Sequence, residues 1–262
     1  MKVSSNIYFE ESCGKLILDN AFEALEKLEE DSVDLIFADP PYFLSSGGIS
    51  NSGGRMVSVD KGDWDKSLTV EEKHMYNKKW IKLCKRVMKD NATIWISGTL
   101  HNIYSVGMAL EEEGFKILNN ITWQKTNPPP NLGCRNFTHS TETILWAKKD
   151  TKKAKHFFDY SRMKSINGDK QMKDVWTGNL TPQHEKVFGS HPTQKPLYLL
   201  ERIIQASSQK CDVVLDPFLG SGTTAVACKK LERNYIGIDI NQDYLEIAEK
   251  RLKNTSTQLS LF

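Results

Sequence analysis

The feature that most constrains the fold is a pair of short, strongly apolar runs that each lead into an Asp-Pro step. Residues Val33–Ala38 lead into the step at Asp39, and residues Val213–Leu215 lead into the step at Asp216. Strongly apolar runs are typical of strands whose two faces are both covered. Proline ends such a strand because it has no N–H to donate to a neighbouring strand. The two runs therefore predict central strands of a sheet with helices on both sides.

Strands and helices alternate through the rest of the sequence. Thr69 and Glu72 form a capping box, which predicts the start of a helix that carries Trp80 on its apolar face. Further strands are expected at 15–18, 92–97, 117–123, 143–147 and 235–238, and further helices at 20–30, 101–113, 223–231, 242–252 and from Pro196 onward. A chain of 262 residues with this alternation predicts one large α/β domain with a doubly wound, mostly parallel sheet.

The downstream Asp-Pro step opens a glycine-rich turn, Asp216-Pro-Phe-Leu-Gly-Ser-Gly-Thr-Thr224, between a strand and a helix. Glycines at such a turn let the backbone approach a nucleotide closely. Asp239 ends the next strand, about 20 residues past the turn, where a carboxylate can accept hydrogen bonds from ribose hydroxyls. The pattern is shorter than G-x-G-x-x-G, which disfavours a dinucleotide. A tight turn without a ligand is the alternative interpretation.

The upstream step belongs to the tetrapeptide Asp39-Pro40-Pro41-Tyr42. Exocyclic amino groups of bases are poor nucleophiles because their lone pairs are delocalised into the ring. A carboxylate at Asp39 and the carbonyl of Pro40 could accept the amino hydrogens, so that the lone pair turns toward a methyl donor. Tyr42 could stack on an extracted base. The alternative is a Pro-Pro strand terminator, and the presence of both motifs in one chain weakens it.

The two motifs, DPPY followed by DPFLGSGTT, resemble those of the β-class amino-methyltransferases that act on DNA. The segment His191-Pro-Thr-Gln-Lys-Pro196 is also similar to that family, and it implies that Thr193 and Lys195 line the donor pocket. Longer segments such as KGDWDK and FTHSTETILWA resemble DpnA-like adenine methyltransferases of GATC restriction–modification systems. The resemblance implies methyl transfer from S-adenosylmethionine to adenine N6, with S-adenosylhomocysteine as product and no metal. It also suggests action on single-stranded as well as double-stranded DNA.

The resemblance implies a circularly permuted, Rossmann-like methyltransferase sheet with an antiparallel edge hairpin, helices on both faces and an inserted target-recognition region. Its expected parts are a catalytic half at 1–124, the edge hairpin and target-recognition region at 125–190, a donor-binding half at 191–254 and a flexible tail at 255–262. The implied catalytic residues are Asp39, Pro40, Pro41 and Tyr42. The implied donor-binding residues are Asp39, Thr193, Lys195, Asp216, Phe218, Gly220, Ser221, Gly222, Thr223, Thr224 and Asp239.

Charge is distributed unevenly along the chain. Residues 1–40 carry a net charge of −7, whereas residues 125–195 carry +7. A basic middle segment suits contact with phosphates, although a solvated lysine-rich surface is an equally simple interpretation. The expected DNA-binding residues are Lys125, Asn131, Arg135, His139 and Trp64.

The final residues provide a separate partner hypothesis. Gln258, Leu259, Leu261 and Phe262 resemble the short peptide by which bacterial DNA enzymes bind the replication sliding clamp. Two apolar anchors beside a glutamine suit a shallow apolar groove, and a tail packed on its own domain is the alternative. A homodimer is a further partner hypothesis.

Composition excludes several other classes of protein. The five cysteines have no C-x-x-C spacing, so a zinc cluster and structural disulfides are not expected, and a reducing cytoplasm is. No apolar run reaches the roughly 18 residues of a membrane helix. The alternatives that stay open are a cytosine-N4 or GANTC-specific DNA methyltransferase, a DNA-binding module without turnover, and a nicotinamide-dependent oxidoreductase.

Overall fold

The computed structural model describes residues 6–41, 49–52, 55–58, 69–150, 152, 155–189 and 191–256. One nine-stranded sheet organises this part of the chain. In spatial order, its strands are β1 (Ile7–Glu11), β2 (Gly14–Leu18), β11 (Asn234–Asp239), β10 (Val213–Asp216), β3 (Val33–Ala38), β6 (Met88–Gly98), β8 (Thr141–Lys149), β7 (Phe115–Lys125) and β9 (Val175–Gly178). Within this sheet, only β1 and β8 run against the other strands.

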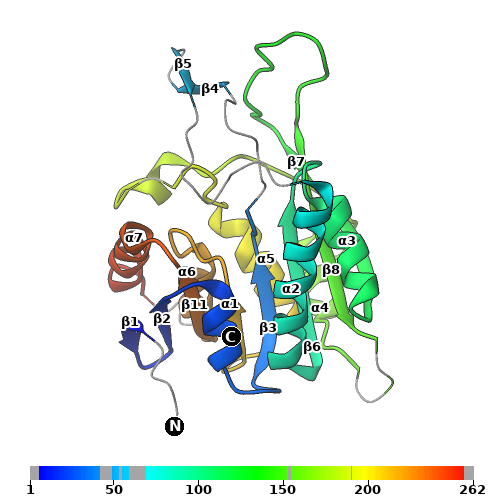
Figure 1. Ribbon diagram of the computed structural model, residues 1–262, viewed down its shortest axis with the longest axis vertical. Coiled ribbons are helices and arrows are strands. Elements are labelled where there is room, and N and C mark those ends of the chain that lie inside the picture. Colours follow the sequence, from blue (N-terminus) through cyan, green and yellow to red (C-terminus); the bar gives the residue numbers. More distant parts are fainter. Residues whose placement is uncertain are drawn as a thin grey trace.

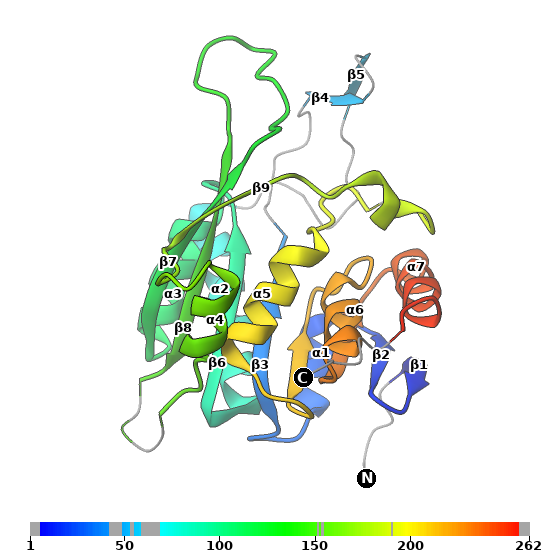
Figure 2. The same cartoon turned by 180° about the vertical axis from the view of Figure 1, so that it is seen from behind.

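Helices cover both faces of the sheet (Figures 1 and 2). On one face lie α1 (Ala21–Lys27), α2 (Val70–Val87) and α3 (Ile103–Glu112). On the other lie α4 (Tyr160–Ile166), α5 (Leu197–Ser207), α6 (Thr223–Lys230) and α7 (Gln242–Lys253), with a short 3-10 helix, η2 (Gln183–Lys186), before α5. Buried apolar residues form two clusters, one with α1–α3 and one with α5–α7. The predicted doubly wound α/β architecture is confirmed.

The ends of α2 and α3 follow from local chemistry. The Thr69 hydroxyl accepts a hydrogen bond from the Glu72 N–H, and the Glu72 carboxylate accepts one from the Thr69 N–H, so the predicted capping box is confirmed. Gly114, which follows the helix predicted at 101–113, has a φ of +72° directly after the C-cap of α3. A glycine adopts this left-handed conformation without the steric cost of a Cβ.

The observed fold differs from the sequence prediction in several places. The edge strands β1 and β9 were not predicted, since each is short and neither has a clear apolar pattern. The antiparallel pair β7–β8 is present, but β9 pairs with β7 and extends the sheet by one strand. Helix α1 ends at Lys27 rather than at residue 30, because Leu28 is already extended at ψ 149°.

A small hairpin lies beyond the carboxyl ends of the parallel strands. It consists of β4 (Ile49–Ser52) and β5 (Arg55–Ser58), which pair in antiparallel fashion. Both views place this hairpin beside the long connection between β7 and β8 (Figures 1 and 2). None of the described helices is long and apolar enough to cross a membrane.

Candidate active site

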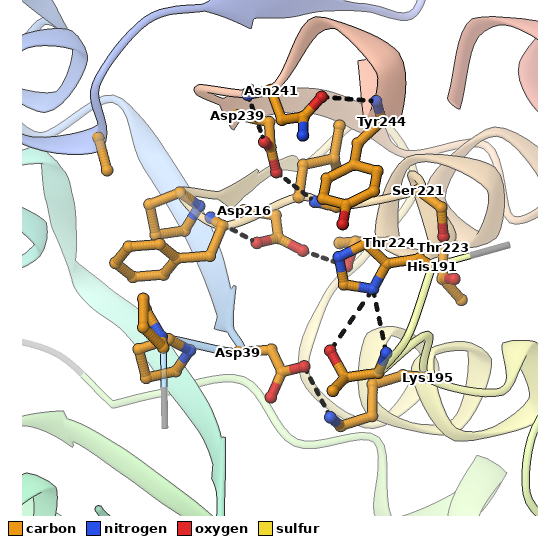
Figure 3. Close-up of a pocket in the computed structure, with 18 of the residues that line it drawn as sticks. Asp39, His191, Lys195, Asp216, Ser221, Thr223, Thr224, Asp239, Asn241 and Tyr244 are labelled. Atoms are coloured by element: carbon orange, nitrogen blue, oxygen red, sulfur yellow. Dashed lines mark hydrogen bonds and ion pairs between the residues drawn. The ribbon is translucent and has the colours of Figure 1, made fainter. Parts of the chain in front are cut away.

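The sheet topology brings the two Asp-Pro motifs together. β3 and β10 are parallel neighbours, with Leu35 opposite Val214 and Ile36 opposite Leu215. Asp39 therefore follows one strand at the same edge where Asp216 ends the other. A cavity of about 510 Å³ opens at this edge and is lined by both residues (Figure 3). Ligands bind at this position in open α/β sheets.

Most of the predicted donor-binding residues line this cavity. They are Asp39, Thr193, Lys195, Asp216, Phe218, Gly220, Ser221, Thr223, Thr224 and Asp239. Pro40 and Pro41 line it as well, whereas Tyr42 lies outside the described residues. Gly222 is not part of the lining. It is the N-cap of α6 with a φ of +82°, and a Cβ there would lie 2.6 Å from the Cβ of Ala248 on α7.

The glycine turn is held from behind by side chains that the motif does not contain. Arg251 of α7 is buried and donates to the Ser221 carbonyl at 2.6 Å and to the Thr223 hydroxyl at 3.0 Å. The Ser221 hydroxyl donates to the Gln194 side-chain oxygen at 3.1 Å. These contacts fix the turn before any ligand binds, which lowers the entropic cost of binding.

Two carboxylates on the turn side, Asp216, which is buried, and Asp239, which is half-buried, accept hydrogen bonds from the protein. Asp216 accepts hydrogen bonds from the Thr224 hydroxyl at 2.6 Å and the Phe218 N–H at 3.0 Å. Burial raises the pKa of Asp216 to about 7, and the nearby Asp39 and Asp239 add to the rise. Asp239 accepts from the Gly220 N–H at 2.7 Å, and burial raises its pKa also. This concentration of acids suits a cationic ligand.

On the other side of the cavity, Asp39 and Lys195 form an ion pair at 2.6 Å (Figure 3). Only 6% of the lysine side chain is exposed. The His191 imidazole lines the cavity and accepts from the Thr193 N–H at 3.3 Å. The HPTQKP segment thus connects the catalytic motif to the donor side.

A buried polar chain, which sequence reasoning missed because its residues are far apart along the chain, supports the backbone of the DPPY motif. The Trp80 indole donates to Asn77 at 3.1 Å, Asn77 donates to Asn102 at 2.7 Å, and Asn102 donates to the Pro41 carbonyl at 3.3 Å. All three side chains in α2 and before α3 are at most 1% exposed. The Trp80 ring also meets the Phe218 ring edge-on at 5.5 Å, so Trp80 contacts Phe218 directly and is linked to Pro41 through the two asparagines.

The predicted DNA-binding residues fall in three different settings. Arg135 and His139 are exposed on the β7–β8 connection, and Asn131 braces that connection by donating to the Asn136 carbonyl. Lys125 instead forms a buried ion pair with Glu142 at 2.6 Å, with 11% of its side chain exposed, so it lies below the surface. Trp64 and the tail residues Gln258, Leu259, Leu261 and Phe262 lie outside the described residues.

The chemistry of the cavity fits S-adenosylmethionine. Asp239, at the end of β11, stands where a carboxylate can accept from ribose hydroxyls. Phe218 offers an aromatic face, to which a sulfonium cation is attracted by about 1 kcal/mol. The carboxylates of Asp39, Asp216 and Asp239, here called the acidic wall, complement the positive charge of the donor. No group of three or more potential metal ligands occurs among the residues that the structure describes.

Comparisons with known proteins agree with this geometry. A family model for N6/N4 methyltransferases, described as DNA methylase, matches residues 33–250. The type II methyltransferase M2.DpnII of Streptococcus pneumoniae is 65% identical over 94% of this chain and 92% of its own length. M2.LlaDCHI of Lactococcus lactis subsp. cremoris is 63% identical over 95% of this chain and 93% of its own length.

A solved structure matches as well. The complex of M1.HpyAVI with S-adenosylmethionine is 31% identical, with a TM-score of 0.67, and the match covers 91% of this chain and 98% of that one. The region matched by the family model contains the DPPY motif, the HPTQKP segment and the glycine turn that together wall the cavity. This chain therefore belongs to the N6/N4 family of DNA methylases.

Proposed function

We propose that this enzyme transfers the methyl group of S-adenosylmethionine to N6 of adenine in GATC sites, as the modification part of a restriction–modification system. The observation that carries the proposal is that Asp39 and the glycine turn line one cavity although Asp39 and Asp216 are 177 positions apart in the sequence (216 − 39). The high identity to two type II methyltransferases supports the assignment to a restriction–modification system.

The roles of the catalytic residues follow from their positions. The Asp39 carboxylate and the Pro40 carbonyl accept the two hydrogens of the target amino group, so that the nitrogen lone pair faces the donor pocket. Lys195 balances the charge of Asp39 by its 2.6 Å ion pair. Tyr42 stacks on the extracted base. The bound donor supplies an electrophilic methyl group, and catalysis by the protein consists of alignment and electrostatic stabilisation.

Replacement of Asp39 by alanine tests these roles. The Asp39→Ala variant should lose transfer by at least roughly 10²- to 10³-fold, the range seen when one stabilising contact to a transition state is removed. Donor binding measured by calorimetry should survive, because the glycine turn is held by Arg251 and Gln194. Transfer by the variant at the wild-type rate would exclude the proposed role of Asp39.

The modified base and site are determined by a second measurement. Oligonucleotides with one GATC site, one GANTC site or neither are methylated in single- and double-stranded form, digested to nucleosides and separated. The proposal expects N6-methyl-2′-deoxyadenosine from GATC substrates. Methylation of cytosine at N4 would contradict the proposed adenine specificity. Methylation confined to GANTC substrates would contradict the proposed GATC specificity.

Residues 125–190 are proposed to form the target-recognition region. The β7–β8 connection carries the exposed Arg135 and His139, and it lies with the β4–β5 hairpin beyond the carboxyl ends of the strands, where the cavity opens (Figure 1). Arginine can pair with guanine edges or phosphates. DNA that enters between these segments and the sheet would present a base to Asp39. Because its substrate is DNA, the enzyme is expected to act in the cytoplasm.

The tail at residues 258–262 is proposed to bind the replication sliding clamp through Gln258, Leu259, Leu261 and Phe262, which would direct the enzyme to newly replicated DNA. A pull-down with purified clamp compares the full chain with a variant that lacks residues 258–262. Unchanged clamp binding by the shortened variant would exclude the proposal. A homodimer is a separate proposal, and sedimentation with and without DNA tests it.

A further inference from the structure

Glu142 is a buried carboxylate that the proposed catalytic scheme does not use. It lies near the start of β8, the strand that runs against its neighbours β6 and β7. This direction places the beginning of β8 at the edge where the parallel strands end and the cavity opens. Only 9% of Glu142 is exposed. The residues next to Glu142 in the sequence do not explain why a carboxylate occupies a buried position of this strand.

The contacts of Glu142 connect it to the catalytic motif through one lysine. Its Oε1 lies 2.6 Å from the Nζ of Lys125, and its Oε2 lies 3.4 Å from the Nζ of Lys195. The same Lys195 Nζ lies 2.6 Å from Asp39. Four buried or half-buried charges therefore alternate in sign in the order Lys125, Glu142, Lys195, Asp39. Within the described residues, Glu142 Oε2 accepts no well-directed hydrogen bond, and Lys195 is the cation it meets.

The charge state of Glu142 is set by these two lysines. Burial raises the pKa of the carboxyl group, but the opposing effect of Lys195 and Lys125 is larger, so its pKa lies below the usual value. Glu142 is thus ionised at neutral pH. A buried row of ion pairs is a weak source of stability, because desolvation offsets most of the attraction. Its place beside Asp39 indicates a role in the reaction.

We propose that Glu142 is a positioning residue for methyl transfer, which holds the Lys195 ammonium so that this ammonium fixes the orientation of the Asp39 carboxylate. Lysine has a long, flexible side chain, and one carboxylate leaves it several rotamers. A second carboxylate restricts Nζ to the space between the two acids. The proposal rests on the role of Asp39 proposed above, and it adds to the site a residue from β8, which lies two strands away from β3.

A double-mutant cycle tests the proposal. Glu142→Gln keeps the shape of the side chain and removes its charge, whereas Lys195→Met removes the ammonium through which Glu142 is proposed to act. We expect Glu142→Gln to lower kcat by roughly 10- to 100-fold, the scale of a small misplacement of a reacting group, with the donor Kd little changed. In the Lys195→Met background, Glu142→Gln should add little further loss, because residues that act as a unit are not additive.

Two further variants control for folding. Glu142→Gln alone leaves Lys125 buried without its carboxylate, so Lys125→Met and Glu142→Gln are also combined, which removes one charge of each sign. This double variant should show the same loss of kcat as Glu142→Gln. Glu201→Gln removes the acid of another half-buried ion pair, that with Lys230 at 2.5 Å between α5 and α6, and it should keep wild-type kcat.

Several outcomes would overturn the proposal. Wild-type kcat in folded Glu142→Gln would do so, as would losses from Glu142→Gln and Lys195→Met that simply multiply. A raised KM for DNA with unchanged kcat would assign Glu142 to substrate binding instead. If Asp39→Ala retains transfer, the proposed function of Asp39 fails first. If Asp39→Ala is inactive while Glu142→Gln is fully active, only the positioning role fails.

Discussion

At the scale of single residues, the site is defined by carboxylates that the protein buries at some cost. Asp39, Asp216 and Asp239 line the same cavity. Burial raises the pKa of both Asp216 and Asp239, and the nearby Asp39 and Asp239 add to the rise at Asp216. The sulfonium charge of the donor offsets the electrostatic cost of these ionised carboxylates, whereas the product formed after methyl transfer has lost that charge. The acidic wall therefore favours exchange of the product for fresh donor.

This electrostatic argument predicts the pH dependence of donor binding. The pKa of Asp216 is about 7, so its negative charge is gained as pH rises through neutrality. Affinity for S-adenosylmethionine should increase between about pH 6 and 8, and affinity for S-adenosylhomocysteine should increase less. Calorimetric titrations at several pH values measure both. Equal pH dependence for the two ligands would contradict the prediction, and Asp216→Asn, which cannot ionise, should reduce the difference.

Ionisation of Asp216 has the opposite effect on the stability of the donor-free enzyme. Because the pKa of Asp216 is raised on folding, its contribution to stability is full at low pH and is lost as pH rises through about 7. The donor-free protein should thus gain more stability from saturating donor at alkaline than at acid pH.

At the scale of elements, the site depends on how closely α6 and α7 pack. Gly222 caps α6 in a left-handed conformation, and Ala248 of α7 lies against it. Arg251, one turn further along α7, holds the turn by its bond to the Ser221 carbonyl. The glycine turn and α7 therefore form one unit, in which the glycine provides space for a neighbouring helix as well as backbone freedom.

Substitution of Gly222 by alanine separates these two effects. A Cβ would lie 2.6 Å from the Cβ of Ala248, so the helices must move apart. We expect a loss of about 1–3 kcal/mol from overpacking, added to a backbone cost of about 1–2 kcal/mol, in chemical denaturation. Gly168→Ala is the matched control, since Gly168 has a φ of +63° with nothing within 4 Å of its Cβ position. Equal losses for the two variants would show that helix packing contributes nothing.

At the scale of the whole molecule, one edge of the sheet collects the cavity, the β4–β5 hairpin and the β7–β8 connection (Figures 1 and 2). The basic segment 125–195 contributes both Lys195 inside the cavity and Arg135 outside it. Helix α4 lies away from this edge, where the N–H of its N-cap Asp159 donates to the Ala206 carbonyl near the C-terminal end of α5. DNA is therefore expected to approach the carboxyl ends of the strands.

Replacement of Arg135 by alanine tests this direction of approach. The variant should bind DNA more weakly and reduce the slope of log affinity against log salt by about 1, as expected for one lost phosphate contact. Donor affinity should not change, because Arg135 does not line the cavity. Lys164→Ala is the control, since it removes one exposed positive charge from the same basic segment on α4. Equal weakening by both variants would mean that net charge, not the loop, determines binding.

Much of the fold and of the donor pocket could be predicted from the sequence, because the signals are local. The strand at Val33–Ala38 was predicted with the bounds observed, and the Thr69 capping box and the glycine turn were located in the same way. Each depends on residues within a few positions of one another. Short edge strands such as β9 were missed because their few residues carry no pattern of their own and are defined by pairing with β7.

The sequence by itself determined which residues can do chemistry: an acid and two prolines after one strand, and a glycine turn after another. Only the tertiary structure decided which of them meet. The order of strands sets β3 beside β10, and the reversed direction of β8 brings Glu142 to Lys195 and draws Lys125 into an ion pair. These contacts join residues far apart in the chain. In the unfolded chain each of these charges is solvated by water, and it meets its ionic partner only when the folded sheet excludes that water. The partner therefore cannot be predicted from neighbouring residues in the sequence.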